Sequence, residues 1–403
     1  MRELRNKTVL LCVGGGIAAY KTCDLVRRLS EAGAAVEVAM TKAATAFITP
    51  LTLQALAQRP VATELLSLDQ EAQIGHIRLA QRADVVLVAP ATADLIARLA
   101  SGLADDVVTA VVLATRAPVI VCPSMNTNML EHPATRRNLE RLADFGYRVV
   151  EPDSGDLACG VRGPGRLPDS DVLVEEVRAA LAPQDLAGTR VLVSAGPTRE
   201  PIDPVRCITN RSSGRTGYAI AAAARRRGAR VTLVSGPVAL RPPRGCQVEA
   251  VETAEQMNEA VRRLVADADV VVMVAAVADY RPVRSEPQKI KKDKERLTIE
   301  LERTPDILGG LRELGGQRIL VGFAAETENV REQALEKLRR KSLDMIVAND
   351  VGRADAGFDA ETNAAVIIDR WGREEQTGLV AKEELAERIL DRVVALLGGP
   401  PAE

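Results

Sequence analysis

The chain has 403 residues, of which 46% are hydrophobic and 27% charged, and its formal net charge is -2. This length predicts two ordinary domains, and the balanced charge gives no reason to expect nucleic acid or an anionic membrane as a partner. Aromatic residues make up only 2% of the chain, so the cores must be packed from Val, Ile, Leu and Ala, which suits buried parallel strands flanked by helices.

The pattern predicts neither secretion nor membrane insertion. Apolar runs such as Val85–Ala89 have the length of a strand, and the charged residues 1–7 lead directly into another strand. The six cysteines follow neither the spacing of a zinc site nor that of a disulfide framework. We therefore expect a protein of the reducing cytoplasm.

The first half alternates strand and helix patterns. A Gly-rich turn at residues 14–16 separates its first strand from an expected helix over Ile17–Ala32, which stops at Gly33. Such alternation predicts a parallel sheet with right-handed crossovers and ligands at the carboxyl ends of the strands. The expected strands are Thr8–Val13, Ala35–Met40, Ala83–Ala89, Ala117–Cys122 and Tyr147–Val150.

A second series of the same kind begins at Thr189, after an expected helix over Val172–Leu181 and an expected linker at Ala182–Asp185. A closing hairpin over Ala364–Gln376 and an amphipathic helix over Lys382–Leu397 end it. The pattern predicts two doubly wound, mostly parallel, Rossmann-like α/β domains, at residues 1–182 and 187–403. The strands expected in the second are Arg190–Ser194, Arg230–Ser235, Asp269–Val274, Arg318–Val321 and Asp344–Val347.

The two halves echo each other. Ala83–Asp94 has the sequence ADVVLVAPATAD, and Ala268–Asp279 has ADVVVMVAAVAD. Upstream of each lies a Gly-rich strand-to-helix turn, at Gly14–Ala19 and at Gly214–Ala219. We infer two related layouts, each with its own nucleotide site; the alternative is that such runs recur in any α/β protein.

The first Gly-rich turn, Gly14-x-Gly16-x-x-Ala19, formally fits a dinucleotide fingerprint, whose glycines let backbone amides approach a phosphate. A dinucleotide site also needs an acid at the end of the second strand. The pair Thr41-Lys42 stands there instead, and it suits a phosphate. The sequence therefore favours a mononucleotide over NAD.

Small residues follow the third strand, at Ala89, Pro90 and Ala91, with Thr92 next. They leave room for a flat ring against the backbone. Thr92 can donate to that ring and can also be the N-cap of the next helix. Ser101 begins a short segment that either closes this pocket or caps a helix.

Three side chains of the first half are candidates for chemistry. Asn126 follows the fourth strand, and its neutral amide can hold a carboxylate. Cys159 lies in a mobile glycine-rich loop with two arginines after it, which makes it a candidate proton donor. His76 stands near the start of an expected helix, where a lone histidine is more often structural. His132, in a turn, is expected to have no catalytic role.

In the second half, the segment Thr209–Gly214 leads into a helix. Its amides, hydroxyls and arginine predict an anion site, with a solvated loop as the alternative. No Gly-Lys-Ser/Thr is present, so this is not a Walker loop. Asp279 ends the third strand, after Ala275 and Ala276, whose small side chains allow close approach of a base or ribose.

The remaining signals of the second half are charges and a helix start. Lys289 belongs to a polar segment over 284–296, expected to be a flap or merely a solvated charge run. Thr304–Leu308 is a clean helix start whose amides could face a ligand. Lys337 and Lys341 share one helix face. There they either neutralise phosphates or offset the negative end of the helix dipole at the C-terminus.

These motifs resemble a known family. GGIAAYK at Gly15–Lys21, His76, PSMN at Pro123–Asn126 and ACGVRGPGR at Ala158–Arg166 resemble the flavin-dependent cysteine decarboxylases. Over nearly its whole length the chain resembles the bifunctional phosphopantothenoylcysteine decarboxylase/phosphopantothenate–cysteine ligases of coenzyme A biosynthesis. One departure is visible, because the family often has Trp after the Met of its Asn loop, where this chain has Leu130.

For the first domain, residues 1–182, the resemblance implies a flavodoxin-like flavoprotein fold with FMN. Oxidation of the substrate's C–S unit to a thioaldehyde by FMN would create an electron sink, so that CO2 can leave. Cys159 would then supply a proton, His76 would assist thiol oxidation, and Asn126 would bind the carboxylate. The residues implied for FMN are Gly15, Gly16, Ile17, Thr41, Ala89, Pro90, Thr92 and Ser101.

For the second domain, residues 187–403, the resemblance implies activation of 4'-phosphopantothenate by CTP. An acyl-cytidylate forms, and the amine of cysteine then displaces CMP. Asn210 and Arg206 would serve the acyl intermediate, and Mg²⁺ would accompany the triphosphate, with Asp279 as a candidate ligand. The match rests on Asn210, the KIKK run, TPDIL and GFAAET at Gly322–Thr327. The residues implied for CTP are Ala275, Ala276, Asp279, Lys289, Pro305, Asp306, Ile307, Leu308, Phe323, Lys337 and Lys341.

The resemblance further implies a homo-oligomer built of trimers, such as a dodecamer, with paired ligase domains, because the flavin site lies between subunits. Its other partners would be small molecules, with no nucleic acid and no membrane. Two alternatives stay open. An NAD-dependent dehydrogenase is disfavoured by the missing ribose acid, and a regulatory binding protein with a dead site is disfavoured by the joint presence of His76, Asn126 and Cys159.

Overall fold

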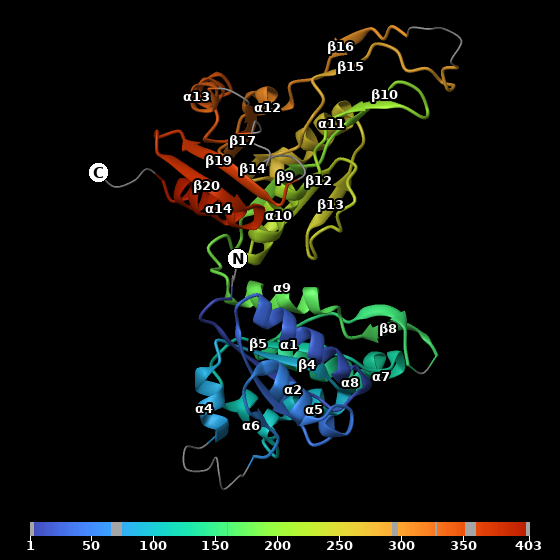
Figure 1. The fold of residues 1–403 in the computed structure, drawn as a ribbon, viewed down its shortest axis with the longest axis vertical. Helices are drawn as coiled ribbons and strands as arrows, with labels where there is room; N and C mark the ends of the chain where they lie inside the picture. The colour runs from blue at the N-terminus through green and yellow to red at the C-terminus, as the bar shows by residue number, and fades with distance from the viewer. Residues whose placement is uncertain are drawn as a thin grey trace. The chain divides into compact units, whose positions relative to one another are not determined.

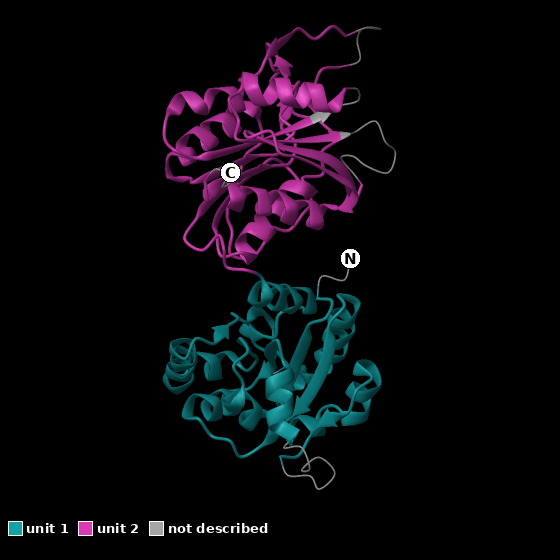
Figure 2. Ribbon diagram, turned by 90° about the vertical axis from the view of Figure 1, so that its left-hand side faces the viewer, with its two compact units in different colours: residues 1–182 teal, residues 183–403 magenta. Residues whose placement is uncertain are grey.

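The computed structural model describes residues 4–65, 75–158, 160–291, 297–326, 329–350 and 360–399. The chain divides into two compact units, unit 1 over residues 1–182 and unit 2 over residues 183–403 (Figure 2). Within the described residues, no helix combines the length and the apolar character that crossing a membrane requires.

Unit 1 is built around a six-stranded parallel sheet with the strand order β3-β2-β1-β4-β5-β6. The central strands are continuous runs of buried Val, Ile and Leu because helices cover both of their faces. The order reverses between β1 and β4, which opens a crevice at the carboxyl ends of these strands. The strands are β1 (Thr8–Val13), β2 (Ala35–Met40), β3 (Val61–Ala62), β4 (Val85–Ala91), β5 (Val119–Pro123) and β6 (Arg148–Val149).

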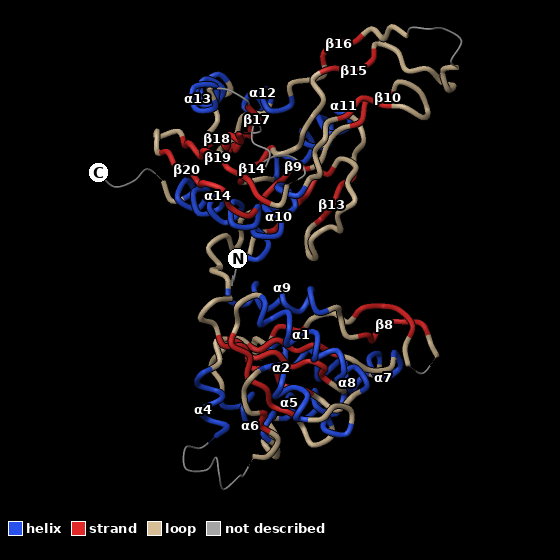
Figure 3. Tube along the Cα trace, viewed as in Figure 1, coloured by secondary structure: helices blue, strands red, loops and turns tan. Residues whose placement is uncertain are grey.

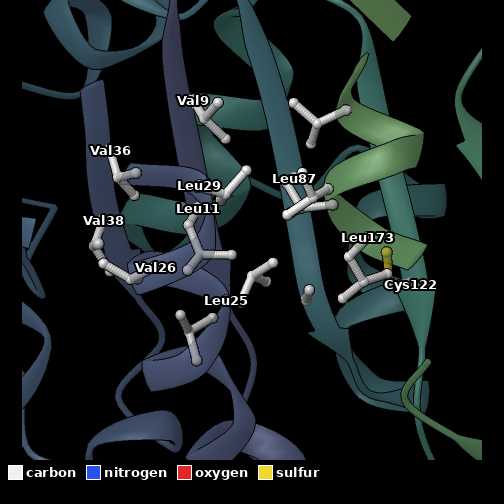
Figure 4. Close-up of a cluster of buried hydrophobic side chains, with 14 of the residues drawn as sticks. Val9, Leu11, Leu25, Val26, Leu29, Val36, Val38, Leu87, Cys122 and Leu173 are labelled. Atoms are coloured by element: carbon white, nitrogen blue, oxygen red, sulfur yellow. The ribbon is translucent and has the colours of Figure 1, made fainter. Parts of the chain in front are cut away.

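The helices of unit 1 pack on both faces of this sheet (Figures 1 and 3). Alternate side chains of β1 point to opposite faces, so that Val9 and Leu11 meet Leu25 and Leu29 of α1 (Figure 4), while Leu10 belongs to the other core. The helical segments are η1 (Ile17–Lys21), α1 (Thr22–Glu31), η2 (Ala44–Ala46), α2 (Pro50–Ala57), α4 (Gly75–Arg82), α5 (Ala93–Ser101), α6 (Val107–Ala114), α7 (Thr127–Glu131), α8 (Pro133–Asp144) and α9 (Ser170–Leu181).

A small antiparallel hairpin follows the sheet of unit 1. Its strands are β7 (Asp153–Asp156) and β8 (Arg162–Arg166). The sequence predicts a glycine-rich loop over Ala158–Arg166, but its second part pairs with β7. The two strands consist of polar residues, Gly and Pro, so no local pattern of hydrophobic residues marks the pairing. Position 159, between the two strands, lies outside the described residues.

Unit 2 contains an eight-stranded sheet with the order β13-β12-β9-β14-β17-β18-β19-β20. The strands from β13 to β18 are parallel, and β19 and β20 extend the sheet as an antiparallel hairpin. Its first six strands repeat the order seen in unit 1. These strands are β9 (Arg190–Ala195), β12 (Arg230–Ser235), β13 (Gln247–Ala250), β14 (Val270–Met273), β17 (Ile319–Glu326), β18 (Met345–Asp350), β19 (Thr362–Asp369) and β20 (Glu374–Ala381).

Helices again cover both faces of the sheet. α10 and α14 share one core, and α11, α12 and α13 share the other. Each helix is amphipathic, with Leu, Ile, Val or Ala on the buried side. The helical segments of unit 2 are α10 (Arg215–Arg226), α11 (Ala254–Leu264), η3 (Val265–Asp267), α12 (Ile307–Gly310), η4 (Arg312–Leu314), α13 (Val330–Arg340) and α14 (Lys382–Leu397).

Two short antiparallel hairpins lie beside each other at one end of unit 2 (Figure 1). The first joins β10 (Arg199–Pro201) to β11 (Cys207–Thr209), and the second joins β15 (Tyr280–Pro282) to β16 (Leu301–Arg303). The described residues 280–291 and 297–303 are called the arm below. The arm contains residues 284–291 of the charged segment that the sequence predicts to be a flap, and the rest of that segment, 292–296, lies outside the described residues.

The predicted fold class is confirmed, since both units are doubly wound α/β structures. The echo between the halves corresponds to β4 and β14, which occupy equivalent places in the two sheets. The predicted helix over Ile17–Ala32 is instead a 3-10 segment followed by α1. The predicted linker is partly folded onto unit 2, because Asp185 forms two hydrogen bonds with Arg227, at 2.8 and 2.6 Å.

Candidate active sites

A cavity of about 1250 Å³ lies in unit 1. It is lined by residues that directly follow four parallel strands: Gly15 and Gly16 after β1, Thr41 after β2, Thr92 after β4 and Ser124 after β5. All four strands end at the same edge of the sheet, on either side of the reversal between β1 and β4. The cavity therefore occupies the place where doubly wound proteins bind nucleotides and flavins.

The floor of this cavity depends on two glycines. The Gly14 amide donates to the carbonyl of Pro90 at 3.0 Å, and a Cβ on Gly14 would lie 2.4 Å from that oxygen. A Cβ on Gly15 would lie 2.4 Å from the Cβ of Ala43. Ala89 and Pro90 do not line the cavity, but they hold the glycine turn against β4. Only residues without a side chain fit at these two positions.

Two threonines at the cavity accept hydrogen bonds from backbone amides of helical segments. Thr92 is the N-cap of α5, and its Oγ1 accepts from the amide of Leu95 at 3.3 Å, which confirms its capping role. Thr41 is buried, and its Oγ1 accepts from the amide of Ala44 at 3.2 Å. Ile17 lines the cavity at the start of a helical segment that has no side-chain cap, so backbone amides are available to an anion there.

Asn126 lines the same cavity from the start of α7. Its Oδ1 accepts from the amide of Asn128 at 2.8 Å, which turns the donor nitrogen of the carboxamide away from the helix. The preceding residue, Met125, donates through its amide to the carbonyl of Gly165 in β8 at 3.0 Å. The segment that carries Asn126 is thus fixed to the hairpin that carries position 159.

Three other residues predicted for this site lie elsewhere or outside the described residues. Residues 156–158 line the cavity, but Cys159 itself is outside the described residues. His76 is half-buried on α4, and exposed Ser101 ends α5; neither lines the cavity of its own unit. His132 is a helix cap whose Nδ1 accepts from the amide of Ala134 at 3.2 Å, in keeping with its expected structural role.

Charged residues of unit 1 also line the cavity, among them Lys42, which the sequence predicts to suit a phosphate. Arg98 forms ion pairs with Asp105 and Asp106. Its hydrogen bond lowers the pKa of Asp105 below the ordinary value. Among the described residues the lining carries balanced charge: Lys21, Lys42, Arg98, Arg166, Asp94, Asp105, Asp106 and Asp156.

Unit 2 has a cavity of about 710 Å³ at the equivalent edge of its sheet. It is lined by Gly196 after β9, by Ala275 and Ala276 after β14, by Phe323 in β17 and by Asn349 in β18. Exposed Asp279 lines it too. The reversal of strand order lies between β9 and β14, so this cavity also stands at a topological switch point.

Asn210 shapes the wall of the unit 2 cavity. Its Nδ2 donates to the carbonyls of Ala276 and Val277, at 3.0 and 3.2 Å. On the other side of the same segment, the Ser194 hydroxyl accepts from the amide of Ala275 at 3.1 Å. The two alanines that the sequence assigns to a nucleotide are therefore held in place by side chains from the neighbouring loop and strand.

The amino end of α10 opens into the unit 2 cavity. Gly214 is its N-cap, in the left-handed conformation with φ 77, and it makes no side-chain capping bond. Residues 212–217 line the cavity. A helix of 12 residues thus directs unpaired amides and the positive end of its dipole into this space. The predicted anion site has this geometry.

Basic side chains line the opposite wall. Lys337 Nζ donates to the carbonyl of Phe323 at 2.7 Å, and Lys341 Nζ contacts Asp306 Oδ1 at 2.7 Å. Asp306 is the N-cap of α12 and accepts from the amide of Gly309 at 3.0 Å. Burial raises the pKa of Asp306, but the bonds from Lys341 and Gly309 outweigh it, and the pKa falls below the ordinary value. Pro305, Ile307 and Leu308 line the same wall.

Two residues predicted for the ligase site do not line this cavity. Arg206 is bound to Asp203 in the turn before β11, and exposed Lys289 lies on the arm. Sequence reasoning also missed several lining residues, although the rule that ligands gather at strand carboxyl ends points to Asn349. The missed residues are Arg215, Arg303, Asn349, Asn363 and Lys382.

The charge of this cavity differs from that of the first. Within the described part of the chain it carries five basic side chains (Arg215, Arg303, Lys337, Lys341 and Lys382) and two acidic ones, Asp279 and Asp306. No group of three or more His, Cys, Asp or Glu that could hold a metal ion occurs among the described residues. A polyanion is the ligand that this lining favours.

Two doubly wound units, each with a cavity at its switch point, define a two-domain protein with a candidate nucleotide or flavin site in each domain. Comparison with known proteins identifies the class more closely. Residues 1–182 match the flavoprotein family, and residues 186–397 match the family described as the C-terminal domain of DNA/pantothenate metabolism flavoproteins.

Relatives match the chain over nearly its whole length. The coenzyme A biosynthesis bifunctional protein CoaBC of Escherichia coli (strain K12) is 50% identical over 397 residues, which cover 97% of this chain and 98% of that protein. The protein of the same name from Bacillus subtilis is 45% identical and covers 98% of each chain. A crystal structure of a CoaBC C-terminal domain is 45% identical and covers 54% of this chain and 100% of that one, with a TM-score of 0.47.

The chain therefore belongs to the family of coenzyme A biosynthesis bifunctional proteins. It is an enzyme with a decarboxylase activity and a ligase activity in coenzyme A biosynthesis, and the unit 2 family is the ligase part. The family resemblance drawn from the sequence motifs is confirmed.

Proposed function

We propose that unit 2 joins 4'-phosphopantothenate to cysteine with CTP, and that unit 1 decarboxylates the product to 4'-phosphopantetheine with FMN. The observation that supports this division is the contrast between the two cavities. Five basic and two acidic side chains line the cavity of unit 2, which suits a triphosphate, whereas balanced charge lines that of unit 1. A flavin with one phosphate needs no large positive excess.

The residues around the first cavity fit FMN. The glycine turn brings backbone close to the cavity, the uncapped start of η1 offers amides to a phosphate, and the space of about 1250 Å³ admits a tricyclic ring. Gly15, Gly16, Ile17, Thr41 and Thr92 would hold the cofactor directly. Ala89 and Pro90 would support them from behind, and Ser101 would act at most from outside the cavity. FMN, when bound, supplies a reversible two-electron oxidation of the substrate.

The chain's own residues would bind the substrate and move protons. Asn126 would donate from its carboxamide nitrogen to the substrate carboxylate and so hold the bond that breaks. Cys159, which follows the cavity-lining residues 156–158, would deliver a proton to the decarboxylated product. His76 would assist oxidation of the substrate thiol.

The position of His76 supports an oligomer. In its own unit this residue does not line the cavity, so a role in the reaction requires that it reach the cavity of a neighbouring copy. A trimer-based assembly, up to a dodecamer with paired ligase units, would supply such a neighbour. The proposed compartment is the cytoplasm.

In unit 2, the amides at the start of α10 and the cations Lys337 and Lys341 would bind the phosphates of CTP. Phe323, Asp279 and the segment Pro305–Leu308 would hold the rest of the nucleotide. Asn210 would serve the acyl intermediate indirectly. It would fix the cavity wall formed by Ala275 and Ala276, and the intermediate would form against that wall. Converting the carboxylate oxygen into part of a leaving group is what allows the amine of cysteine to attack.

Arg206 and Lys289 would complete the ligase site of a paired copy, since neither lines the cavity of its own unit. Both belong to the end of unit 2 where the two hairpins lie. Mg²⁺ would be held by the triphosphate with at most Asp279 from the described lining, because this ion commonly takes one carboxylate and several phosphate or water oxygens.

The division of labour is tested with the full-length protein, by recording its absorbance spectrum and by following pyrophosphate release, amide formation and CO2 release separately. We expect a bound-flavin spectrum and amide formation that depends on CTP. A colourless protein that releases CO2, or amide formation at an equal rate with ATP, would contradict the proposal.

A further inference from the structure

Asp203 joins two segments of unit 2 that are far apart in the chain. Its side chain is completely buried, at 0% exposure. Its Oδ1 accepts from the amides of Val205 and Arg206, at 2.8 and 2.9 Å. Its Oδ2 accepts from the amide of Ile290, on the arm, at 3.1 Å. One carboxylate therefore closes the turn before β11 and holds the arm at the same time.

Arg206 completes this junction. Its Nε donates to Asp203 Oδ2 at 3.0 Å, and its Nη2 donates both to that carboxylate and, at 3.0 Å, to the carbonyl of Ile290. A backbone bond from Glu286 to the carbonyl of Ile202 runs alongside at 2.9 Å. The guanidinium of Arg206 holds the pKa of the Asp203 carboxyl well below its usual range. The Asp203 carboxylate is therefore charged at neutral pH.

The junction contains one residue of the proposed ligase site and adjoins another. Arg206 is part of it, and Lys289 directly precedes Ile290, whose amide and carbonyl are both engaged. Neither Arg206 nor Lys289 lines the cavity of its own unit. A buried carboxylate with all of its donors in place has little freedom, so the junction sets the distance between these two cations.

We propose that Asp203 is a positioning residue of the ligase, which holds Arg206 and the Lys289 segment in one arrangement so that the two cations meet the bound substrates together. This inference rests on the proposed function of unit 2. A carboxylate that only stabilised the turn would affect folding. The effect of its removal on ligation would then be the same whichever residue stands at position 289.

The test uses the full-length protein and measures KM and kcat for amide formation. Asp203→Asn keeps the size of the side chain but puts a donor nitrogen where an acceptor oxygen is needed. We expect KM for CTP or for 4'-phosphopantothenate to rise about tenfold, the effect of losing one charge-assisted hydrogen bond. Decarboxylation in unit 1 should be unchanged.

Asp344→Asn is the matched control. Asp344 is also a buried aspartate of unit 2, at 1% exposure, and it contacts Arg312 and Arg370 away from the cavity. This variant should lower the melting temperature and leave both KM values as in the wild type. Asp203→Glu, which restores the carboxylate, should recover part of the lost affinity.

The double variant Asp203→Asn/Lys289→Gln separates positioning from stability. If Asp203 acts through Lys289, the double variant should ligate no more slowly than the slower single variant. Two defects that multiply, or wild-type KM values in Asp203→Asn, would overturn the inference. Wild-type ligation by both Lys289→Gln and Asn210→Asp would overturn the proposed site itself, which is a different result.

Discussion

Units 1 and 2 have the same order of their first six strands and place a cavity at the same edge of the sheet, but they line that cavity differently. In unit 1 the lining includes a glycine turn, two threonines that accept from backbone amides of helical segments, and balanced charge. In unit 2 it is the bare amino end of α10 and a positive excess. One topology thus offers a position for a ligand, and the residues after each strand decide which ligand it is.

The second difference concerns the hairpins. In unit 1, the β7–β8 hairpin is fixed to the Asn126 segment and contributes residues 156–158 to its own cavity. In unit 2, Tyr280 and Arg303 of the arm line the cavity, but Lys289 does not, and neither does Arg206, which binds the arm at the carbonyl of Ile290. Under the proposed function, the decarboxylase site would therefore need His76 from elsewhere, and the ligase site would need Arg206 and Lys289.

The largest effect is expected from Cys159→Ser. If the hairpin of unit 1 supplies the proton, formation of the saturated amine thiol should fall roughly 10²–10⁴-fold, while ligation continues unchanged. Mass spectrometry should find an oxidised product that has already lost CO2. A normal yield of 4'-phosphopantetheine would remove Cys159 from the mechanism.

Asn210→Asp should come next. The new carboxylate would face the carbonyls of Ala276 and Val277 without a hydrogen to donate, and two unsatisfied acceptors predict a loss of about 100-fold in ligation. Decarboxylation of supplied substrate should be normal. Asn258→Asp is the control, since its Oδ1 accepts from Arg262 Nε at 3.1 Å on the surface of α11 and an aspartate can do the same. Equal ligation by both variants would contradict the role of Asn210.

The beginning of unit 2 offers a test of how independent the units are. Arg227, 3% exposed, pairs with Asp185, and Leu186 is fully buried. A fragment that starts at Ala187 lacks both. Arg227 keeps its ion pairs with Asp391 and Glu387, so the expected loss of about 3 kcal/mol comes mainly from the burial of Leu186. At this size that lowers the melting temperature by roughly 6–12 °C relative to a fragment that starts at Pro183. Equal melting temperatures would show that residues 183–186 connect the two units without stabilising unit 2.

The smallest expected effect is the loss of stability of the fold at low pH. Seven described aspartates have a pKa below the ordinary value. At Asp306 and Asp369 burial raises the pKa, but hydrogen bonds to the carboxylate lower it by more. At the other five, a hydrogen bond to the carboxylate is the largest cause of the lowered pKa. A folded pKa below the unfolded value of about 3.9 stabilises the fold above that pH, and the contribution disappears as the pH falls through the folded pKa. The described aspartates with lowered pKa are Asp185, Asp203, Asp269, Asp306 and Asp369 in unit 2, and Asp24 and Asp105 in unit 1.

Unit 2 should therefore lose more stability than unit 1 between about pH 5 and pH 2. Thermal unfolding of fragments 1–182 and 183–403 at several pH values measures this directly. The fall in melting temperature should be steeper for the second fragment. Parallel curves would show that these ion pairs contribute equally little in both units.

The sequence predicts the centres of both sheets well. β1, β2, β12 and α14 have the expected bounds, because continuous Val, Ile and Leu runs and a 3.6-residue period each allow one interpretation. The hairpins β10–β11 and β15–β16 were not predicted, since their strands are short and polar and form only by pairing with each other. β3 and β13, at the sheet edges, were missed because they are only two and four residues long.

Site residues could be predicted where neighbouring residues in the sequence mark their position, and not where tertiary packing alone brings them to the cavity. Gly15, Thr41 and Asn126 follow strands directly, and they line a cavity as the strand-end rule requires. Lys382 lies at the start of the last helix and reaches the unit 2 cavity only because α14 packs beside α10. No local pattern carries that information. Under the proposed function, the role of His76 would likewise depend on contacts beyond its own unit.

The central claim is that equivalent cavities in the two units hold different ligands, and separate fragments test it most directly. Residues 1–182 and 183–403 are purified apart, and each is examined by absorbance spectroscopy and by CTP-dependent amide formation. The first fragment should carry a flavin spectrum and form no amide, and the second should be colourless and should form the amide when its concentration allows pairing. A flavin spectrum in the second fragment, or a folded first fragment that takes up no FMN, would contradict the account.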